Sequence, residues 1–384
     1  MEASESASTP MLRRLNALAV LDAMRARGAV TGSELMADTR LSRPTVHAVC
    51  ADLMARGLVS EVEVRVPGTG SQPGRRPRQY VFNARAGHVI GIDLGAKKVT
   101  VQLADLRGDP VAERTSVFSH EHVRARPRLD GVRRTVGRVL DEAGVDATSV
   151  RAVAMGVPAP VDNDGHVVAT QEYLPDLPGR DLRGVLSMYG WTTHVDNDAN
   201  LAVIGERWRG VAQGCDNVIE LLAGYRLGSA LFLDGRLVRG SAGRAGELTF
   251  LSMLEGVGNT DAIAELAEVY GAEAGLPEAD AEAVFEAARA GEASAVAVLS
   301  RVLDRIARVI AVFGTFLNPE LVVIGGGVAG AGDLIIPGLE QRLPALTESP
   351  PRLAASGLGD HAVLTGAVRV ALDTVEATIL RQPS

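Results

Sequence analysis

The segment 88–114 reads HVIGIDLGAKKVTVQLADLRGDPVAER, and it decides the fold of most of the chain. An apolar run, a turn at 93–95, an alternating run, a tight turn at 107–110 and a third run predict consecutive antiparallel strands. The segment 217–240, NVIELLAGYRLGSALFLDGRLVRG, repeats this plan about 130 residues later, with Asp234-Gly235 as its tight turn. A duplicated unit predicts two similar lobes, with a ligand site in the cleft between them.

Each repeat places a glycine-containing turn where a cleft ligand would lie. In the second repeat this turn is Gly224-Tyr-Arg-Leu-Gly228. A bound phosphate needs close approach to bare backbone N–H groups, and Tyr225 and Arg226 add bulk at that point. Arg226 is able to pair with a phosphate itself, but one guanidinium does not replace a cradle of N–H groups. We therefore expect this turn not to hold a phosphate.

The composition is that of a globular protein. With 384 residues and 46% hydrophobic content, the chain is long enough for two or three domains. Its two cysteines, Cys50 and Cys215, have no spacing typical of a disulfide framework or a zinc finger. The first residues, MEASESASTPML, are acidic and polar, unlike a signal peptide, and no apolar run reaches membrane-spanning length. The expected location is the cytoplasm.

Charge is distributed unevenly along the chain. The net charge is -8, yet residues 11–80 contain 11 Arg and no Lys against 6 Asp and Glu, a local net charge of +5. The remainder is therefore acidic, and only the N-terminal part suits a polyanionic partner.

The N-terminal part has the sequence signals of three short helices. The residues Leu15, Leu18, Leu21 and Met24 repeat at helical spacing, and Gly28 follows as a C-cap. A capping box at 31–34, TGSE, predicts that a second helix starts there. Ser42 is a third N-cap with Pro44 in the first turn, and Val46, Val49, Cys50, Leu53 and Met54 lie on one face of the helix that follows.

This order predicts a helix-turn-helix module whose last helix reads DNA. Arg43, Thr45 and His47 fall on the outer face of the first turns, where base edges would lie. His47 fits equally well as a plain surface residue. The predicted contacts are Ser42, Arg43, Pro44, Thr45 and His47, together with Arg75 and Arg76 of the loop described next.

A predicted wing follows the helices. The alternating run at 58–66 and the run at 80–82 form a hairpin, and the loop PGTGSQPGRRPRQ presents Arg75, Arg76 and Arg78. An arginine held extended by Gly and Pro suits a narrow minor groove. An arginine-rich loop is also common as a solvated linker, but the cap spacing, the wing and the local basic excess together favour DNA binding.

Taken in order, the motifs LSRPTV, GRRP, GIDLG, GVPAPVD, NDAN, AGE and NPELVVIGGG resemble the ROK family of repressors, open reading frames and sugar kinases. The resemblance covers nearly the whole chain. It implies an α/β protein with an N-terminal winged helix-turn-helix and a two-lobed actin-like ATPase, ribonuclease-H-like (sugar kinase) fold. We expect a disordered tail at 1–10, a DNA-binding domain at 11–84, a first lobe at 85–196 joined by a C-terminal helix at 365–384, and a second lobe at 197–364 with the effector site and dimer interface.

The resemblance also implies site residues in the cleft. In family members the Asp of Asn-Asp-Ala-Asn accepts the proton of the sugar hydroxyl and the preceding Asn binds the sugar, which correspond to Asp198 and Asn197. Glu247 corresponds to a glutamate that binds sugar hydroxyls. Without the resemblance, the Asx cluster is better explained as the cap of the helix that follows. With it, we expect Asn197, Asp198 and Glu247 to contact an effector.

Four departures from the kinase pattern are visible. The first phosphate turn has Lys97 at the usual Thr position, and the second contains Tyr225 and Arg226. Phe250 replaces the histidine that binds sugar and zinc and offers no metal lone pair. The cysteine cluster of the zinc site is absent, and His120, His122, His166, His194 and His361 show no ligand spacing. We therefore expect no cofactor and no metal.

These features predict a sequence-specific transcriptional regulator, a repressor of carbohydrate-related genes, rather than an enzyme. Its kinase-like body binds a sugar or amino sugar and forms a homo-oligomer, dimer or tetramer, on a double-stranded DNA operator. Two alternatives stay open at this point: an active ROK sugar kinase carrying a DNA-binding domain, and a ligand-independent regulator that uses the body as a dimerisation scaffold.

Overall fold

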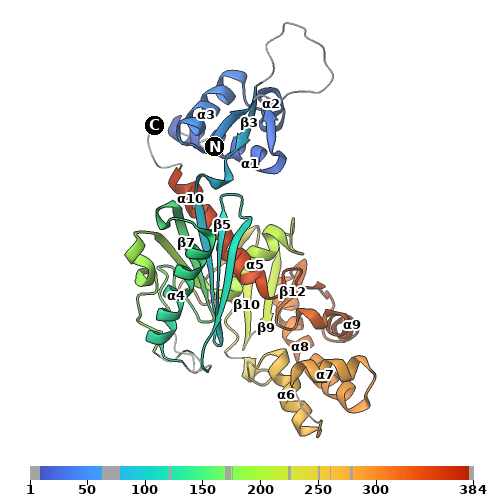
Figure 1. Ribbon diagram of the computed structural model, residues 1–384. Helices are drawn as coiled ribbons and strands as arrows, with labels where there is room; N and C mark the ends of the chain where they lie inside the picture. The colour runs from blue at the N-terminus through green and yellow to red at the C-terminus, as the bar shows by residue number, and fades with distance from the viewer. Residues whose placement is uncertain are drawn as a thin grey trace.

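The computed structural model describes residues 9–62, 78–120, 123–168, 174, 176–223, 226–249, 251–259, 261–276 and 280–379. A small N-terminal domain lies at one end of a larger two-lobed body, and the C-terminal helix reaches from that body to the small domain (Figure 1). Several residues named in the predictions above lie outside the described residues: Arg75, Arg76, Gly224, Tyr225 and Phe250.

The N-terminal domain packs three helices on a small antiparallel sheet of order β1-β3-β2. Its elements are α1 Thr9–Arg27, β1 Ala29–Thr31, α2 Gly32–Thr39, α3 Arg43–Ala55, β2 Val59–Val62 and β3 Gln79–Phe82. The β2–β3 pair confirms the strands of the predicted wing. The helix α1 begins at Thr9, within the segment 1–10 that we expected to be a disordered tail.

Local capping signals determine where α2 and α3 begin. The Thr31 backbone N–H donates to Glu34 over 2.7 Å, and the Glu34 N–H donates to Thr31 Oγ1 over 3.2 Å, which is the predicted capping box. Ser42 caps α3 as predicted. The predicted first helix is confirmed as α1, and Leu15 within it is 50% exposed because it lies outside the core.

The two lobes have the same sheet topology, which confirms the duplication predicted from the sequence. The first sheet has the order β6-β5-β4-β7-β8, and the second has β11-β10-β9-β12-β13. In each, three successive strands are antiparallel and two later strands run parallel to the first of them. The strands are β4 His88–Leu94, β5 Lys98–Asp105, β6 Pro110–Val117, β7 Val150–Val157, β8 Thr192–Asn197, β9 Val218–Ala223, β10 Leu227–Leu233, β11 Arg236–Val238, β12 Leu321–Gly326 and β13 Arg352–Ala355.

Helices cover both sheets. They are α4 Ala125–Ala143, α5 Asp198–Arg209, α6 Ile263–Glu273, α7 Ala281–Arg289, α8 Ala293–Leu317, α9 Gly332–Arg342 and α10 Ala362–Ile379. The apolar faces of α6, α7, α8 and α9 share one core with β9 and β12, while α4 packs on β5 and β6. The boundaries predicted for the two lobes remain a proposal, because α5 and α10 pack on each other and each also contacts the first sheet.

Two glycines allow α5 and α10 to cross at very short range. A Cβ atom added to Gly366 would collide with the backbone carbonyl of Leu201, and one added to Gly205 would collide with that of Ala362. The two helix backbones are therefore in direct contact, without side chains between them. This crossing joins the elements that carry the cleft to those that reach the N-terminal domain.

A carboxyl group is buried in the second sheet. Glu220 on β9 and Glu206 on α5 are both 0% exposed, and among the described residues neither oxygen of Glu220 has a hydrogen-bond partner. Burial, and then the charge of Glu206, raises the pKa of Glu220 well above its ordinary value. Burial therefore favours the protonated form of Glu220 in the folded protein.

We expect Glu220→Met to stabilise the protein by about 1–2 kcal/mol at pH 8, because it removes a buried polar group that has no partner. The folded pKa lies above the unfolded one, so wild-type stability falls as the pH rises above the ordinary value of 4.5. The gain should therefore shrink as the pH approaches 4.5. Urea denaturation at pH 5 and pH 8 measures it, and Glu220→Gln, which removes only the ionisation, should abolish this part of the pH dependence. An equal gain at both pH values would contradict the assignment.

Candidate functional site

The N-terminus of α3 presents a polar, exposed surface. Ser42, Arg43 and Pro44 are exposed, and Thr45 is half-buried. Ser42 Oγ lies 2.8 Å from Thr45 Oγ1 and accepts the Thr45 backbone N–H over 3.4 Å. These contacts fix the first turn, whose free backbone N–H groups favour a phosphate. The arrangement leaves Arg43 able to reach past the turn.

The wing sheet restrains two of the predicted contact residues. The Nδ1 atom of His47 lies 3.2 Å from the hydroxyl of the buried Tyr80 on β3, so His47 is oriented by the sheet although it is exposed. Arg78, expected to project from the wing, instead pairs with Glu61 of β2, with 2.9 Å between Nε and Oε1. The remainder of that loop lies outside the described residues.

The second candidate site is at the N-terminus of α5, where β8 ends. Asn197 is the N-cap: its Oδ1 accepts the N–H of Ala199 over 2.9 Å and of Asn200 over 3.3 Å, and its Nδ2 donates to Ala159 O over 3.1 Å. Asp198, the next residue, is half-buried. A contribution to capping the helix does not prevent Asp198 from also contacting a ligand. The structure thus places Asn197 mainly as a structural cap.

Carboxyl groups from separate segments influence one another at the N-terminus of α5. Burial, the charge of Asp93 and then the charge of Glu247 raise the pKa of Asp198 to about 8, against the opposing hydrogen bond from the Ala199 N–H. Asp93, at the end of β4, has its pKa raised to about 6 by burial. Glu247 is exposed. A protonated Asp198 is both a hydrogen-bond donor and an acceptor, which suits a ligand with neighbouring hydroxyl groups.

An inter-lobe ion pair that the sequence analysis missed supports this cleft. Asp196 on β8 is buried and accepts hydrogen bonds from Asn200 Nδ2 and from Arg239, which follows β11 of the other lobe. Burial alone would raise the pKa of Asp196, but His194, whose Nε2 lies 3.6 Å away, and Arg239 hold it below its ordinary value. This charged pair orients the turn that carries Asn197.

The second glycine turn differs from the prediction in one respect. Arg226, considered above as a possible phosphate partner, pairs with Asp261, with 2.5 Å between Nη1 and Oδ1. The charge of Arg226 is therefore balanced by a carboxylate of the second lobe. The neighbouring Gly224 and Tyr225 lie outside the described residues, so the expectation that this turn excludes phosphate stays a prediction.

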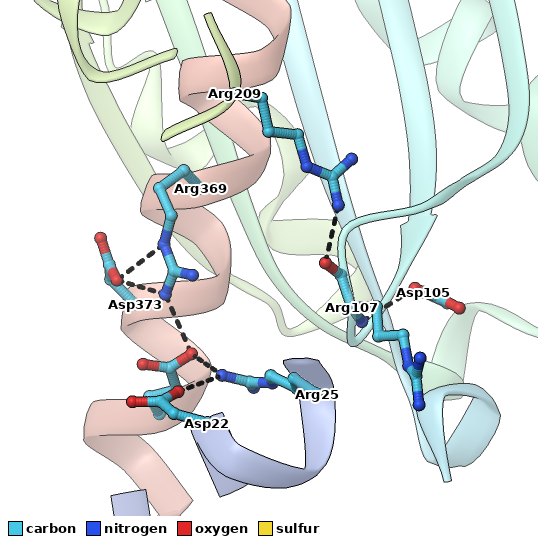
Figure 2. Close-up of polar contacts among 8 residues, drawn as sticks. Asp22, Arg25, Asp105, Arg107, Arg209, Arg369 and Asp373 are labelled. Carbon is cyan, nitrogen blue, oxygen red and sulfur yellow. Dashed lines mark hydrogen bonds and ion pairs between the residues drawn. The ribbon is translucent and has the colours of Figure 1, made fainter. Parts of the chain in front are cut away.

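Ion pairs connect the body to the N-terminal domain (Figure 2). Arg25 of α1 donates to Glu376 of α10 over 2.5 Å, and Arg369 of α10 donates to the same oxygen over 2.9 Å. Asp373 also accepts from Arg369 over 3.0 Å. Glu376 is only 15% exposed, so this bridge is shielded from solvent more than a typical surface pair.

A second connection runs through α5. Its last residue, Arg209, donates to the carbonyl group of Gly108 over 2.9 Å. It also donates to the carbonyl group of Arg107 over 3.1 Å (Figure 2). The Arg107 guanidinium in turn lies 5.9 Å from the ring centre of Phe82 in the wing sheet. A helix of 12 residues is about 18 Å long. The helix α5 therefore runs from Asp198 to a turn that contacts the N-terminal domain.

One loop brings possible metal ligands together. Atoms of Asp162, Asp164 and His166 lie within 4.8 Å of one another, although the sequence analysis found no ligand spacing around His166. The group is largely exposed, and Asp162 Oδ1 already accepts the backbone N–H groups of Asp164 and His166 over 2.9 Å each. These bonds account for the loop shape without an ion. In the described parts of the chain, none of the helices is both long enough and apolar enough to span a membrane.

Comparisons with known proteins match two parts of the chain. The sequence model of the ROK family matches residues 89–374, and that of the IclR helix-turn-helix domain matches residues 15–63. A glucokinase from Thermotoga maritima is 30% identical over 280 residues, which cover 66% of this chain and 86% of that protein. A putative xylose repressor from Caldicellulosiruptor sp. is 24% identical, and the match covers 96% of this chain and 98% of the repressor.

A solved structure is similar over almost the full length. The crystal structure of a ROK family transcriptional regulator, a homologue of the E. coli MLC protein, superposes with a TM-score of 0.76 at 20% identity, covering 96% of this chain and 99% of that one. At this identity the likeness establishes the shared fold alone.

Proposed function

This chain belongs to the ROK family, and on that premise we propose that it is a sequence-specific DNA-binding transcriptional regulator, a repressor of carbohydrate-related genes. The observation that carries the proposal is the path between the two sites. The helix α5 begins at Asp198 in the cleft and ends at Arg209, whose partner turn contacts the N-terminal domain. The similarity to a putative xylose repressor over 96% of the chain supports the same function.

In this proposal the first turn of α3 reads an operator. Arg43 contacts base edges, Ser42, Pro44 and Thr45 shape the turn, and His47 lies alongside. Arg75 and Arg76 of the wing contact the minor groove. A symmetric homo-oligomer, a dimer or a tetramer, would place two such helices about one helical turn apart on a near-palindromic site. The protein would work in the cytoplasm, where its operator is.

The effector in this proposal is a sugar or amino sugar held by Asp198 and Glu247, with Asn197 shaping the site. Closure of the lobes on the sugar would move α5 and α10 and with them the N-terminal domain. A difference of only about 1–3 kcal/mol in effector affinity between the two arrangements suffices for a useful switch. If no sugar binds, the body serves as a dimerisation scaffold, and the DNA-binding part of the proposal stands.

We propose further that the body has lost kinase activity. Lys97 at the Thr position, the substituted second turn and Phe250 at the histidine position each remove a group that phosphoryl transfer requires. The observation that favours retained kinase activity is the 30% identity to a glucokinase. An active kinase fused to a DNA-binding domain is therefore the second candidate.

An assay of the full chain decides between these functions. We expect no phosphorylation above background when the protein is mixed with ATP, Mg²⁺ and glucose, xylose, N-acetylglucosamine or N-acetylmannosamine in a coupled assay. We expect genome-wide mapping of bound DNA to recover sites near carbohydrate genes, and one of the sugars to release a recovered site. Turnover well above background would refute the loss of activity. An absence of specific sites would refute the regulator.

A further inference from the structure

A cavity lies beside the C-terminal half of α5, at Ile204, Arg207 and Trp208. Its volume is about 470 Å³, which is within the range of small-molecule sites. Residues of β8, α5, β10, β11, the segment after β11 and α10 line it. None of Asn197, Asp198 and Glu247 is among its lining residues. This cavity is therefore separate from the proposed effector site.

Three guanidinium groups from three segments converge on this cavity. They belong to Arg207 of α5, Arg239 after β11 and Arg369 of α10, and their side chains are 22%, 33% and 19% exposed. Each already has an acidic partner, Asp216, Asp196 and Asp373 respectively. Arg369 also donates to Glu376, and Arg207 also donates to the carbonyl group of Cys215. A guanidinium has five N–H donors, so each of the three arginines keeps donors for another anion. Against three lining arginines, the lining contains one carboxylate, Asp373.

The remaining lining is apolar and aromatic. Ile204, Leu237 and Val370 are half-buried, and Trp208 and Phe232 complete the wall. The guanidinium of Arg207 lies 4.0 Å from the ring centre of Phe232, which holds this arginine flat against the wall. His194 adds a buried Nε2 atom that forms no hydrogen bond with the described residues. The lining of the cavity thus combines apolar and aromatic side chains with positively charged guanidinium groups.

We propose that this cavity is a second ligand site, for a small organic anion with an apolar or aromatic body and a carboxylate or phosphate group. The anionic group lies among Arg207, Arg239 and Arg369, and the apolar body packs on Ile204, Leu237 and Val370. A free sugar lacks both parts of this match. Because Arg369 also holds Glu376, the partner of Arg25, an occupant lies beside the bridge to the DNA-binding domain (Figure 2).

The chain contains two tryptophans, so a single substitution makes Trp208 the reporter for its own cavity. The full chain carrying Trp191→Phe is titrated with phenylacetate and, as the uncharged control of similar shape, with 2-phenylethanol. We expect saturable change in Trp208 fluorescence with phenylacetate, at least tenfold tighter than with the alcohol. The unfolding temperature of this variant without ligand verifies that it is folded.

Two further variants test the placement. Val370→Phe fills the cavity without touching an ion pair and should weaken phenylacetate binding at least tenfold. Arg207→Gln removes one guanidinium and should weaken it about fivefold. Asp198→Asn, in the other site, should leave it unchanged, so this site and the proposed effector site fail or succeed separately. No saturation with phenylacetate, equal binding of the alcohol, or unchanged binding in Val370→Phe would each overturn the proposal.

Discussion

Replacing Arg43 by alanine is expected to weaken binding to the preferred operator by about 1–3 kcal/mol, or roughly 5- to 150-fold, and to relax the base preference at one position. Arg43 is the first residue of α3, is exposed, and follows a capped turn whose N–H groups face the DNA backbone in our proposal. Loss of a base-edge contact lowers affinity for the best site more than for random DNA. Fluorescence anisotropy with both DNAs, at one fixed salt concentration, measures the two effects.

Arg56→Ala provides the matched control. Arg56 is the C-cap of the same helix and pairs with Asp52, with 3.0 Å between Nε and Oδ2. A helix of 13 residues separates the two arginines by about 20 Å, so Arg56 lies far from the proposed base contacts. Its loss should leave the base preference intact. If Arg43→Ala and Arg56→Ala lower affinity equally, and on both DNAs, then the reading surface is not at the N-terminus of α3.

The elements of the fold were predictable where the signal is local. The caps at Thr31 and Ser42 involve residues three positions apart. The duplicated strands are recognisable from the alternation of apolar and polar residues and from the tight turns between them. The family resemblance supplied the two-lobed arrangement. The helix crossing at Gly205 and Gly366 was not predicted, because a glycine within a helix has many possible causes and its partner is 161 residues away in the sequence.

The candidate site was less predictable because its polar contacts join distant segments. Arg226 to Asp261, Arg239 to Asp196 and Arg25 to Glu376 span 35, 43 and 351 residues. A single sequence contains many arginines and carboxylates and does not specify which of them meet. The partner of Arg226 changes the chemistry of the second turn, since its charge serves Asp261 rather than a ligand.

The protonation state of Asp198 was not predictable from the sequence, because it too depends on residues of distant segments. The motif NDAN identifies Asp198 as a candidate, but its pKa depends on burial and on Asp93 and Glu247, which come from other segments. Three carboxyl groups in one cleft cannot all ionise at low cost. The raised pKa of Asp198 follows from this cost.

Asp198→Ala should therefore have opposite effects on stability and on sugar binding. The pKa of Asp198 is about 8 in the folded protein and ordinarily 3.8, so folding at pH 7 requires protonation of this group. Its removal should stabilise the ligand-free protein by about 1–3 kcal/mol, after allowance for solvent screening of a half-buried group. Helix capping is retained because Asn197 also accepts the Ala199 N–H. Sugar affinity should fall at least about tenfold, since one hydrogen-bond partner of the sugar is lost.

The pH dependence separates this explanation from a general gain in packing. A raised folded pKa means that wild-type stability is greatest below about pH 4 and declines as the pH rises towards 8. The advantage of Asp198→Ala should follow that decline, being small at pH 4 and largest at pH 8 and above. Asp198→Asn should share the stability gain and keep part of the sugar affinity. Thermal unfolding of the three proteins from pH 4 to 9, with and without glucose, xylose or N-acetylglucosamine, gives both quantities. A variant less stable than wild type at pH 8, or one with full sugar affinity, would show that Asp198 is neither a strained carboxyl group nor a ligand contact.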